Sequence, residues 1–174
     1  MTDFEKIVRL FSESEIECVI VGGLAATIHG SARLTQDVDF VYARNRANVR
    51  RLVAALRPHS PYLRGVPPGL PFEWSETMIE RGLNFTLTTT LGDIDLLGEI
   101  TGGGDYQALV PHSVDIEMFR CRCRCLDLPG LIRVKRGRGV QGISRRSRSL
   151  KRFLKSATTG PGIDRGSTSA REGA

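Results

Sequence analysis

Hydrophobic residues recur along this chain with two different periods, which predict helices and strands in turn. Residues 3–13 and 45–57 carry apolar side chains at three- and four-residue steps, so we expect an amphipathic helix over each range. Residues 17–21 and 37–41 are short apolar runs that predict buried strands, and residues 24–29 predict a short helix between them. The first third of the chain therefore mixes helices with strands.

Two hairpins are predicted in the second half of the chain. Residues 83–97, LNFTLTTTLGDIDLL, alternate apolar and polar side chains before Leu91-Gly92 and return as an apolar strand after it. Residues 114–126 alternate in the same way about a turn near Phe119-Arg120. We expect four strands from these two segments.

The connections differ in composition. Residues 58–75 contain five prolines and predict a long loop, in which Trp74 is an apolar anchor or, less favoured, a platform for a nucleic-acid base. Residues 99–109 predict a glycine-rich connection followed by a helix that Asp105 caps, with a phosphate cradle as the alternative. Asp127 is expected to cap a last helix.

Charge is divided unevenly along the chain, whose net charge is +6. Residues 1–130 carry 13 Lys and Arg against 17 Asp and Glu, whereas residues 131–174 carry 12 against 2. After residue 136 the chain is rich in Arg, Ser and Gly without a sustained period, so we expect a domain over 1–136 and a disordered basic tail over 137–174. A shift of reading frame near residue 137 is the alternative explanation of this tail.

The cysteines favour a reducing compartment. Cys121, Cys123 and Cys125 alternate with arginines, a spacing that predicts one buried face of a strand rather than a zinc site. No apolar run approaches the roughly 20 residues of a membrane span, and the acidic N-terminus is unlike a signal peptide. We therefore expect a soluble cytoplasmic protein without a membrane partner.

Two aspartates carry the candidate chemistry. Asp37 and Asp39 lie one residue apart in a predicted strand, so their side chains leave on the same face. Two like charges beside an apolar run cost free energy unless a cation neutralises them. Mg²⁺ is the expected cofactor, with Mn²⁺ as the alternative, because hard divalent cations prefer carboxylate oxygens.

A glycine pair precedes these aspartates. Gly22 and Gly23 follow the first predicted strand and precede the short helix, where free backbone N–H groups favour an anion such as a phosphate. A phosphate-binding turn close to a metal-binding pair of carboxylates indicates metal-assisted phosphoryl or nucleotidyl transfer.

The string GGLAATIHGSARLTQDVDF resembles the signature of the DNA polymerase β-like nucleotidyltransferase superfamily. It is similar to small prokaryotic members related to the nucleotidyltransferases of abortive-infection, or type IV toxin–antitoxin, systems. The resemblance covers residues 4–136. It implies an α+β nucleotidyltransferase fold, in which helices pack mainly on one face of a mixed β-sheet.

The resemblance also implies further site residues. A third carboxylate is expected on a neighbouring strand, where Asp95 is our choice for metal binding and catalysis and Asp93 is the alternate. Lys135 either reaches the triphosphate or is a surface lysine. Two further residues, Arg33 and Thr35, either contact the nucleotide or a carboxylate or are solvated loop residues.

His29 is expected to cap the short helix, with a nucleotide contact as the alternative.

We therefore expect an enzyme that moves a nucleoside monophosphate from a nucleoside triphosphate to a hydroxyl of a protein, a tRNA or a small molecule. A catalytically weak, nucleotide-binding regulator or antitoxin is the alternative. A cognate toxin or antitoxin, a second copy of the chain, and a nucleic acid bound by the tail are the other expected partners.

Overall fold

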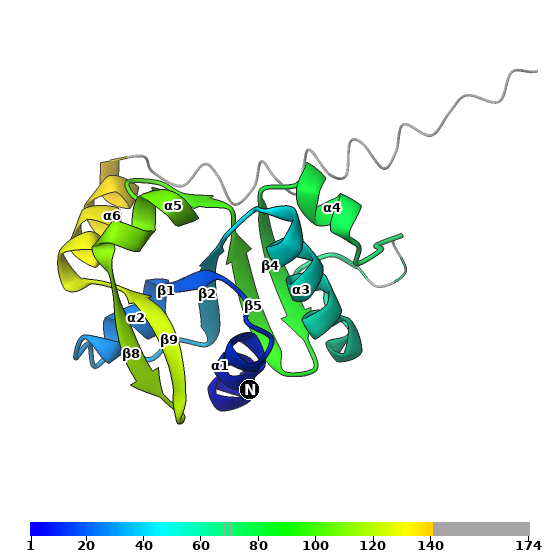
Figure 1. Ribbon diagram of the computed structural model, residues 1–174, viewed down its shortest axis with the longest axis horizontal. Helices are drawn as coiled ribbons and strands as arrows, with labels where there is room; N and C mark the ends of the chain where they lie inside the picture. The colour runs from blue at the N-terminus through cyan, green and yellow to red at the C-terminus, as the bar shows by residue number, and fades with distance from the viewer. Residues whose placement is uncertain (68, 70, 141–174) are drawn as a thin grey trace, which may run out of the picture. The chain divides into compact units, whose positions relative to one another are not determined.

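The structure is a computed structural model that describes residues 1–67, 69 and 71–140, and its strands form one large and one small β-sheet (Figure 1). Its α-helices are α1 (Phe4–Glu13), α2 (Gly22–Ile28), α3 (Arg46–Leu56), α4 (Glu76–Arg81), α5 (Tyr106–Leu109) and α6 (Leu128–Val140). Its strands are β1 (Cys18–Val21), β2 (Asp37–Tyr42), β3 (Tyr62–Leu63), β4 (Asn84–Thr89), β5 (Gly92–Leu97), β6 (Glu99–Ile100), β7 (Gly104–Asp105), β8 (Ser113–Met118) and β9 (Cys121–Leu126).

The large sheet has seven strands in the order β3-β4-β5-β2-β1-β9-β8. Strand β2 runs parallel to β5, and β1 runs parallel to β9, while the other neighbouring pairs are antiparallel. Strands β6 and β7 form the small sheet. The expected mixed sheet in an α+β fold is therefore confirmed.

One face of the sheet packs against α1. Phe40 of β2 stacks on Phe11 of α1, with ring centroids 4.2 Å apart. Phe11 lies on the same helical face as the buried Ile7 and Val8, so the predicted apolar stripe of this helix is its contact surface. In Figure 1, α3 and α4 lie over the β4–β5 end of the sheet.

The opposite face has its own apolar core beside β1, which we call the α5–α6 core. It joins residues in or next to β1, β2, β6 and β9 to residues of the two late helices α5 and α6: Val19, Val21, Val41, Ala43, Ile100, Tyr106, Leu109, Leu126 and Val134. Figure 1 shows α5 and α6 gathered at this end of the molecule. Because Asp37 and Asp39 alternate onto the same face as Val41, the two aspartates border this core.

Most predicted elements are confirmed with bounds that differ by one or two residues, but the predicted loop over residues 58–75 contains the short strand β3. The short helix begins at Gly22 rather than Leu24, so both glycines belong to its first turn. Helix α6 continues to Val140, beyond residue 136, where the sequence analysis ended the domain. The predicted tail from residue 141 onward lies outside the described residues.

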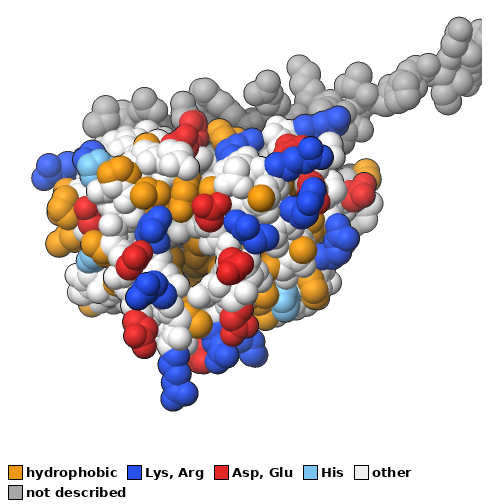
Figure 2. Space-filling model, in the orientation of Figure 1, with side chains coloured by type: hydrophobic (Ala, Val, Ile, Leu, Met, Phe, Trp, Pro, Cys, Tyr) orange, Lys and Arg blue, Asp and Glu red, His pale blue; other side chains and the backbone are white. Residues whose placement is uncertain are grey.

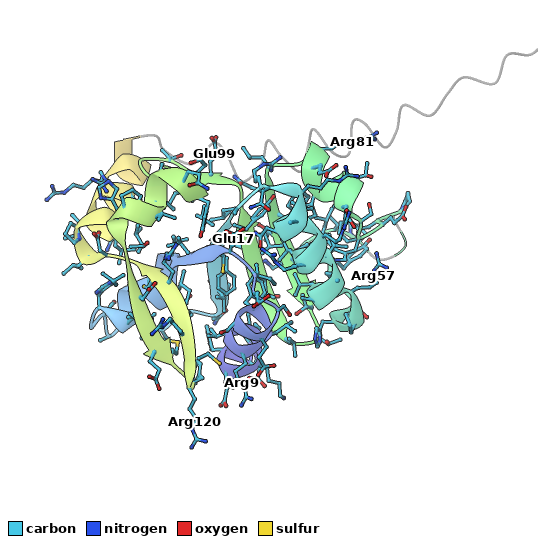
Figure 3. All side chains as sticks on the ribbon, viewed as in Figure 1. Arg9, Glu17, Arg57, Arg81, Glu99 and Arg120 are labelled. Carbon is cyan, nitrogen blue, oxygen red and sulfur yellow. The ribbon has the colours of Figure 1, made fainter. Side chains whose placement is uncertain are left out.

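The second hairpin turns as expected. Phe119 and Arg120 both have positive φ angles, 52° and 63°, which suit the tight turn between β8 and β9. Arg120 extends from the tip of this hairpin away from the body of the domain (Figure 3). Acidic and basic side chains are interspersed over the face shown in Figure 2.

Trp74 adopts the apolar role that was favoured, and the cysteines do so only in part. The indole N–H of Trp74 donates to the Val53 carbonyl at 3.0 Å, and the ring is buried against α3. All four cysteines are free thiols, but of the predicted buried face only Cys125 is buried, while Cys121 and Cys123 are partly exposed near the hairpin tip. Within the described part of the chain, no helix has both the length and the apolar character needed to cross a membrane.

Candidate active site

Four carboxylates share one face of the sheet at its centre. Strands β2 and β5 are parallel and in register, which places Asp37 opposite Asp93 and Asp39 opposite Asp95. Residues opposite each other on neighbouring strands project to the same face, about 4.8 Å apart along the sheet. The structure therefore brings together Asp37, Asp39 and Asp95, as the sequence analysis expected, and adds the alternate Asp93.

The inner pair of carboxylates is the more deeply buried. Asp39 is 9% exposed and Asp95 is 4% exposed, whereas Asp37 and Asp93 are half-buried nearer the strand ends. Burying a carboxylate without a compensating cation or hydrogen bonds costs several kcal/mol, on the order of the desolvation of one ion. This pair is therefore the part of the site where a positive charge stabilises the fold most.

The glycine pair lies against the aspartate strand. Gly22 has a φ angle of +67°, and a Cβ built on it would collide with the Asp39 carboxylate. A Cβ on Gly23 would likewise collide with the Thr35 side chain. Only glycine permits both the left-handed backbone and this close approach, so the start of α2 is held beside the carboxylates.

Thr35 orients the first aspartate. Its hydroxyl donates to Asp37, with 3.0 Å between Oγ1 and Oδ1, and lies 3.2 Å from the Asp37 carbonyl oxygen. This is the carboxylate contact that was one of the two expectations for Thr35. This hydrogen bond to Oδ1 restricts the rotation of the Asp37 carboxylate and so fixes the position of its other oxygen.

The sequence analysis missed Arg64, which comes from the proline-rich segment. Its guanidinium contacts three of the four carboxylates: Nη1 lies 3.0 Å from Asp93 and 3.6 Å from Asp37, and Nη2 pairs with Asp95. Arginine suits this position because its planar fork donates to several carboxylate oxygens at once. Arg64 lies in a predicted loop and is distant in sequence from each aspartate, so no local pattern could predict it as a site residue.

The backbone around Arg64 is fixed by the sheet. The Arg64 N–H donates to the Thr86 carbonyl at 2.9 Å, which extends the β3–β4 pairing by one residue. Thr86 is opposite Asp95, so Arg64 lies in the same cross-strand row as Asp95 and Asp39. The Tyr62 hydroxyl also donates to the Pro67 carbonyl at 2.8 Å and stabilises the following turn.

The charges of Arg64 and Asp93 stabilise each other. Burial alone would raise the pKa of Asp93, but hydrogen bonds from Arg64 and Thr88 outweigh it and lower this pKa. Burial alone would lower the pKa of Arg64, but the hydrogen bond to Asp93 and the three nearby carboxylates raise it. Both groups are therefore ionised at neutral pH.

The donor set suits a hard divalent cation. Carboxylate oxygens on one face are the ligands that Mg²⁺ prefers, and Asp37, Asp39 and Asp95 supply them from two adjacent strands. Among the described residues, 1–67, 69 and 71–140, however, no three acidic, His or Cys side chains converge as a ligand group. The guanidinium of Arg64 lies among the carboxylates instead and offsets one of their four negative charges.

The other residues considered in the sequence analysis are Arg33, Lys135 and His29. Arg33 is exposed in the loop before β2, and Lys135 is exposed on α6. His29 ends α2, and its Nε2 lies 2.8 Å from the Leu126 carbonyl oxygen. His29 is thus the C-cap of α2, as favoured, and its ring additionally ties α2 to the end of β9.

Comparison with known proteins identifies the fold. No protein-family model matches the sequence, and no curated protein matches it. A crystal structure from Thermotoga maritima, described as that of a "putative nucleotidyltransferase", is similar over 90% of this chain and 96% of its own, with a TM-score of 0.55 and 12% identity. The chain therefore has the nucleotidyltransferase fold that the sequence resemblance implied.

Proposed function

We propose that this chain is a metal-dependent nucleotidyltransferase that moves a nucleoside monophosphate from a nucleoside triphosphate to a hydroxyl acceptor. One observation carries the proposal: the in-register carboxylates of β2 and β5 lie beside the Gly22–Gly23 start of α2. The same fold in a protein described as a "putative nucleotidyltransferase" agrees with it.

Each side chain has a distinct place in the proposed reaction. Asp37, Asp39 and Asp95 would hold Mg²⁺ or Mn²⁺, which would supply charge neutralisation of the nucleotide phosphates and a lower pKa for the acceptor hydroxyl. Thr35 keeps Asp37 in position through its hydrogen bond. We assign phosphate contacts to the backbone N–H groups at Gly22 and Gly23, and nucleotide contacts to Arg33 and Lys135.

The proposed chemistry is one substitution at the α-phosphorus. The acceptor oxygen forms a bond to the α-phosphorus while the bond to the oxygen bridging the α- and β-phosphates breaks, and pyrophosphate leaves. Asp95 accepts the proton of the acceptor hydroxyl as general base. Its position opposite Asp39 places it at the centre of the four carboxylates.

Labelled nucleotides test this proposal directly. The full chain is incubated with α-labelled nucleoside triphosphates, Mg²⁺ and a cell lysate, and the labelled product is identified. An Asp37→Asn/Asp39→Asn double variant should reduce labelling about a hundredfold or more, because two metal ligands are lost. Asp115→Asn, which removes an exposed carboxylate from β8, is the matched control. Equal labelling by the double variant and the wild type would refute the assignment.

A regulatory role is the second candidate. The contact of Arg64 with three carboxylates favours it, because a protein cation already occupies oxygens that the metal would need. A regulator or antitoxin of this kind would bind a nucleoside triphosphate without turnover and would co-purify with a cognate toxin or antitoxin protein. Binding measured by calorimetry, together with the labelling assay, separates the two functions.

A further inference from the structure

We propose that Arg64 is a built-in counter-cation that competes with the divalent metal for the same carboxylates. Its guanidinium pairs with Asp37, Asp93 and Asp95 in the metal-free protein and leaves Asp37 and Asp95 when the metal binds. This inference rests on the proposed function, because it concerns the regulation of that site.

The charge balance of the sheet face requires such a cation. Four carboxylates on two adjacent strands repel one another, and the innermost of them, Asp39 and Asp95, are almost fully buried. Like charges at this distance disfavour the ionised form unless an opposite charge is close. Arg64 supplies that charge from its own strand row, and its side chain is only 24% exposed.

A guanidinium and a metal ion cannot use these oxygens together. Arg64 donates to an oxygen of Asp95 and pairs with one of Asp37, and both carboxylates belong to the proposed metal ligands. Two cations held at the same partly buried oxygens would repel each other. Metal binding therefore displaces the guanidinium.

The displacement involves the side chain, because the backbone of Arg64 is hydrogen-bonded to β4. The N–H of Arg64 donates to Thr86, and the turn after it is closed by the bond from Tyr62 to Pro67. The long side chain can rotate while this anchor stays in place. The released guanidinium remains next to the site, where its fork suits the phosphates of an incoming nucleotide.

Metal affinity without nucleotide is the direct test. Calorimetric titration of the full chain with Mn²⁺ compares the wild type with Arg64→Gln and with Arg50→Gln, whose arginine pairs with Glu76 on α4. Arg64→Gln should bind Mn²⁺ more tightly, on the order of tenfold, as is typical of coupling between competing ligands. Arg50→Gln, which loses the same charge elsewhere, should bind like the wild type. Unchanged or weaker binding by Arg64→Gln would overturn the proposal.

A measurement on the unmodified protein covers the case in which Arg64→Gln does not fold. The Nε–H resonance of Arg64, assigned with the Arg64→Lys variant, should move on Mg²⁺ titration toward the position of a solvated arginine. A resonance that stays constant while the metal binds would contradict displacement, and so would the absence of metal binding by both the wild type and Arg64→Lys.

The outcomes also separate this inference from the proposed enzyme activity. Tighter metal binding by Arg64→Gln without any labelled product would support the competition and refute nucleotidyl transfer. Labelled product together with equal metal affinities of the wild type and Arg64→Gln would support nucleotidyl transfer and refute the competition. In an active enzyme, Arg64→Gln should lower the metal concentration needed for half-maximal rate and raise the KM for the nucleotide, because the released guanidinium no longer contacts phosphate.

Discussion

The backbone of Gly22 lies directly against the side chain of Asp39, in the space that a Cβ at position 22 would need. The glycine pair and the aspartate pair are therefore one structural unit, although they are separate motifs in the sequence. The start of α2 is held beside the carboxylates by this contact and by the contact of Gly23 with Thr35. Two substitutions can separate this packing from the cost of the backbone conformation alone.

Gly22→Ala should destabilise the protein more than Gly30→Ala. Both glycines have positive φ angles, +67° and +91°, which cost about 1–2 kcal/mol for a residue with a Cβ. At Gly30 nothing lies within 4 Å of the added Cβ, whereas at Gly22 the Asp39 carboxylate must move. Urea unfolding in EDTA measures both changes, and equal losses of unfolding free energy would contradict the packing argument.

Asp95 and Asp93 should differ in their effect on metal affinity. Asp93 accepts hydrogen bonds from Arg64 and Thr88, and its N–H donates to Thr2, so the protein already uses it to close the β4–β5 turn. Asp95 lies opposite Asp39 and is almost fully buried. Asp95→Asn should weaken Mn²⁺ binding about a hundredfold or more, since a charged ligand is lost.

Asp93→Asn is the matched control for this experiment. It should reduce the free energy of unfolding while leaving Mn²⁺ affinity much closer to that of the wild type. Calorimetric titration of both variants decides between them, and a larger loss of affinity in Asp93→Asn would exchange the two assignments.

Asn48→Ala should cost about 3 kcal/mol or more of unfolding free energy. The buried Asn48 side chain accepts the Glu17 N–H at 2.8 Å and donates to the carbonyls of Glu17 and Ala43. Alanine would leave three backbone groups without these partners, at about 1–3 kcal/mol for each buried group. Asn45→Ala removes the neighbouring N-cap of α3 and should cost only about 1 kcal/mol in the same denaturation experiment. Similar losses in the two variants would refute this role of Asn48.

Cys125 should make the protein less stable in alkali. Burial raises the pKa of its thiol from 9.0 to about 12, so the native state keeps a proton that the unfolded chain releases above pH 9. The unfolded state then binds fewer protons, and stability falls as pH rises from 9 toward 12. Denaturation at several pH values should show a smaller alkaline loss for Cys125→Ala than for Cys121→Ala. The same slope in both variants would exclude this contribution.

Local patterns were enough to predict the elements that carry the site. The helices around Phe11 and Leu52 follow from apolar steps of three and four residues, and both hairpins follow from alternation about short turns. The start of α2 was placed two residues late, because glycine has a poor intrinsic preference for helices and its packing against Asp39 is not a local property. Asp95 was found through the family resemblance together with its place in a predicted strand.

The sequence by itself determined that Asp37 and Asp39 share a face and that glycines precede them, because strand alternation and glycine geometry are local rules. Tertiary structure alone decided the register of β2 against β5, which brings four carboxylates together. It also decided the arrival of Arg64, which directly follows β3, a strand two places away from β5 in the sheet. Pairing between strands distant in sequence depends on the packing of the whole sheet, and no spacing within one segment encodes it.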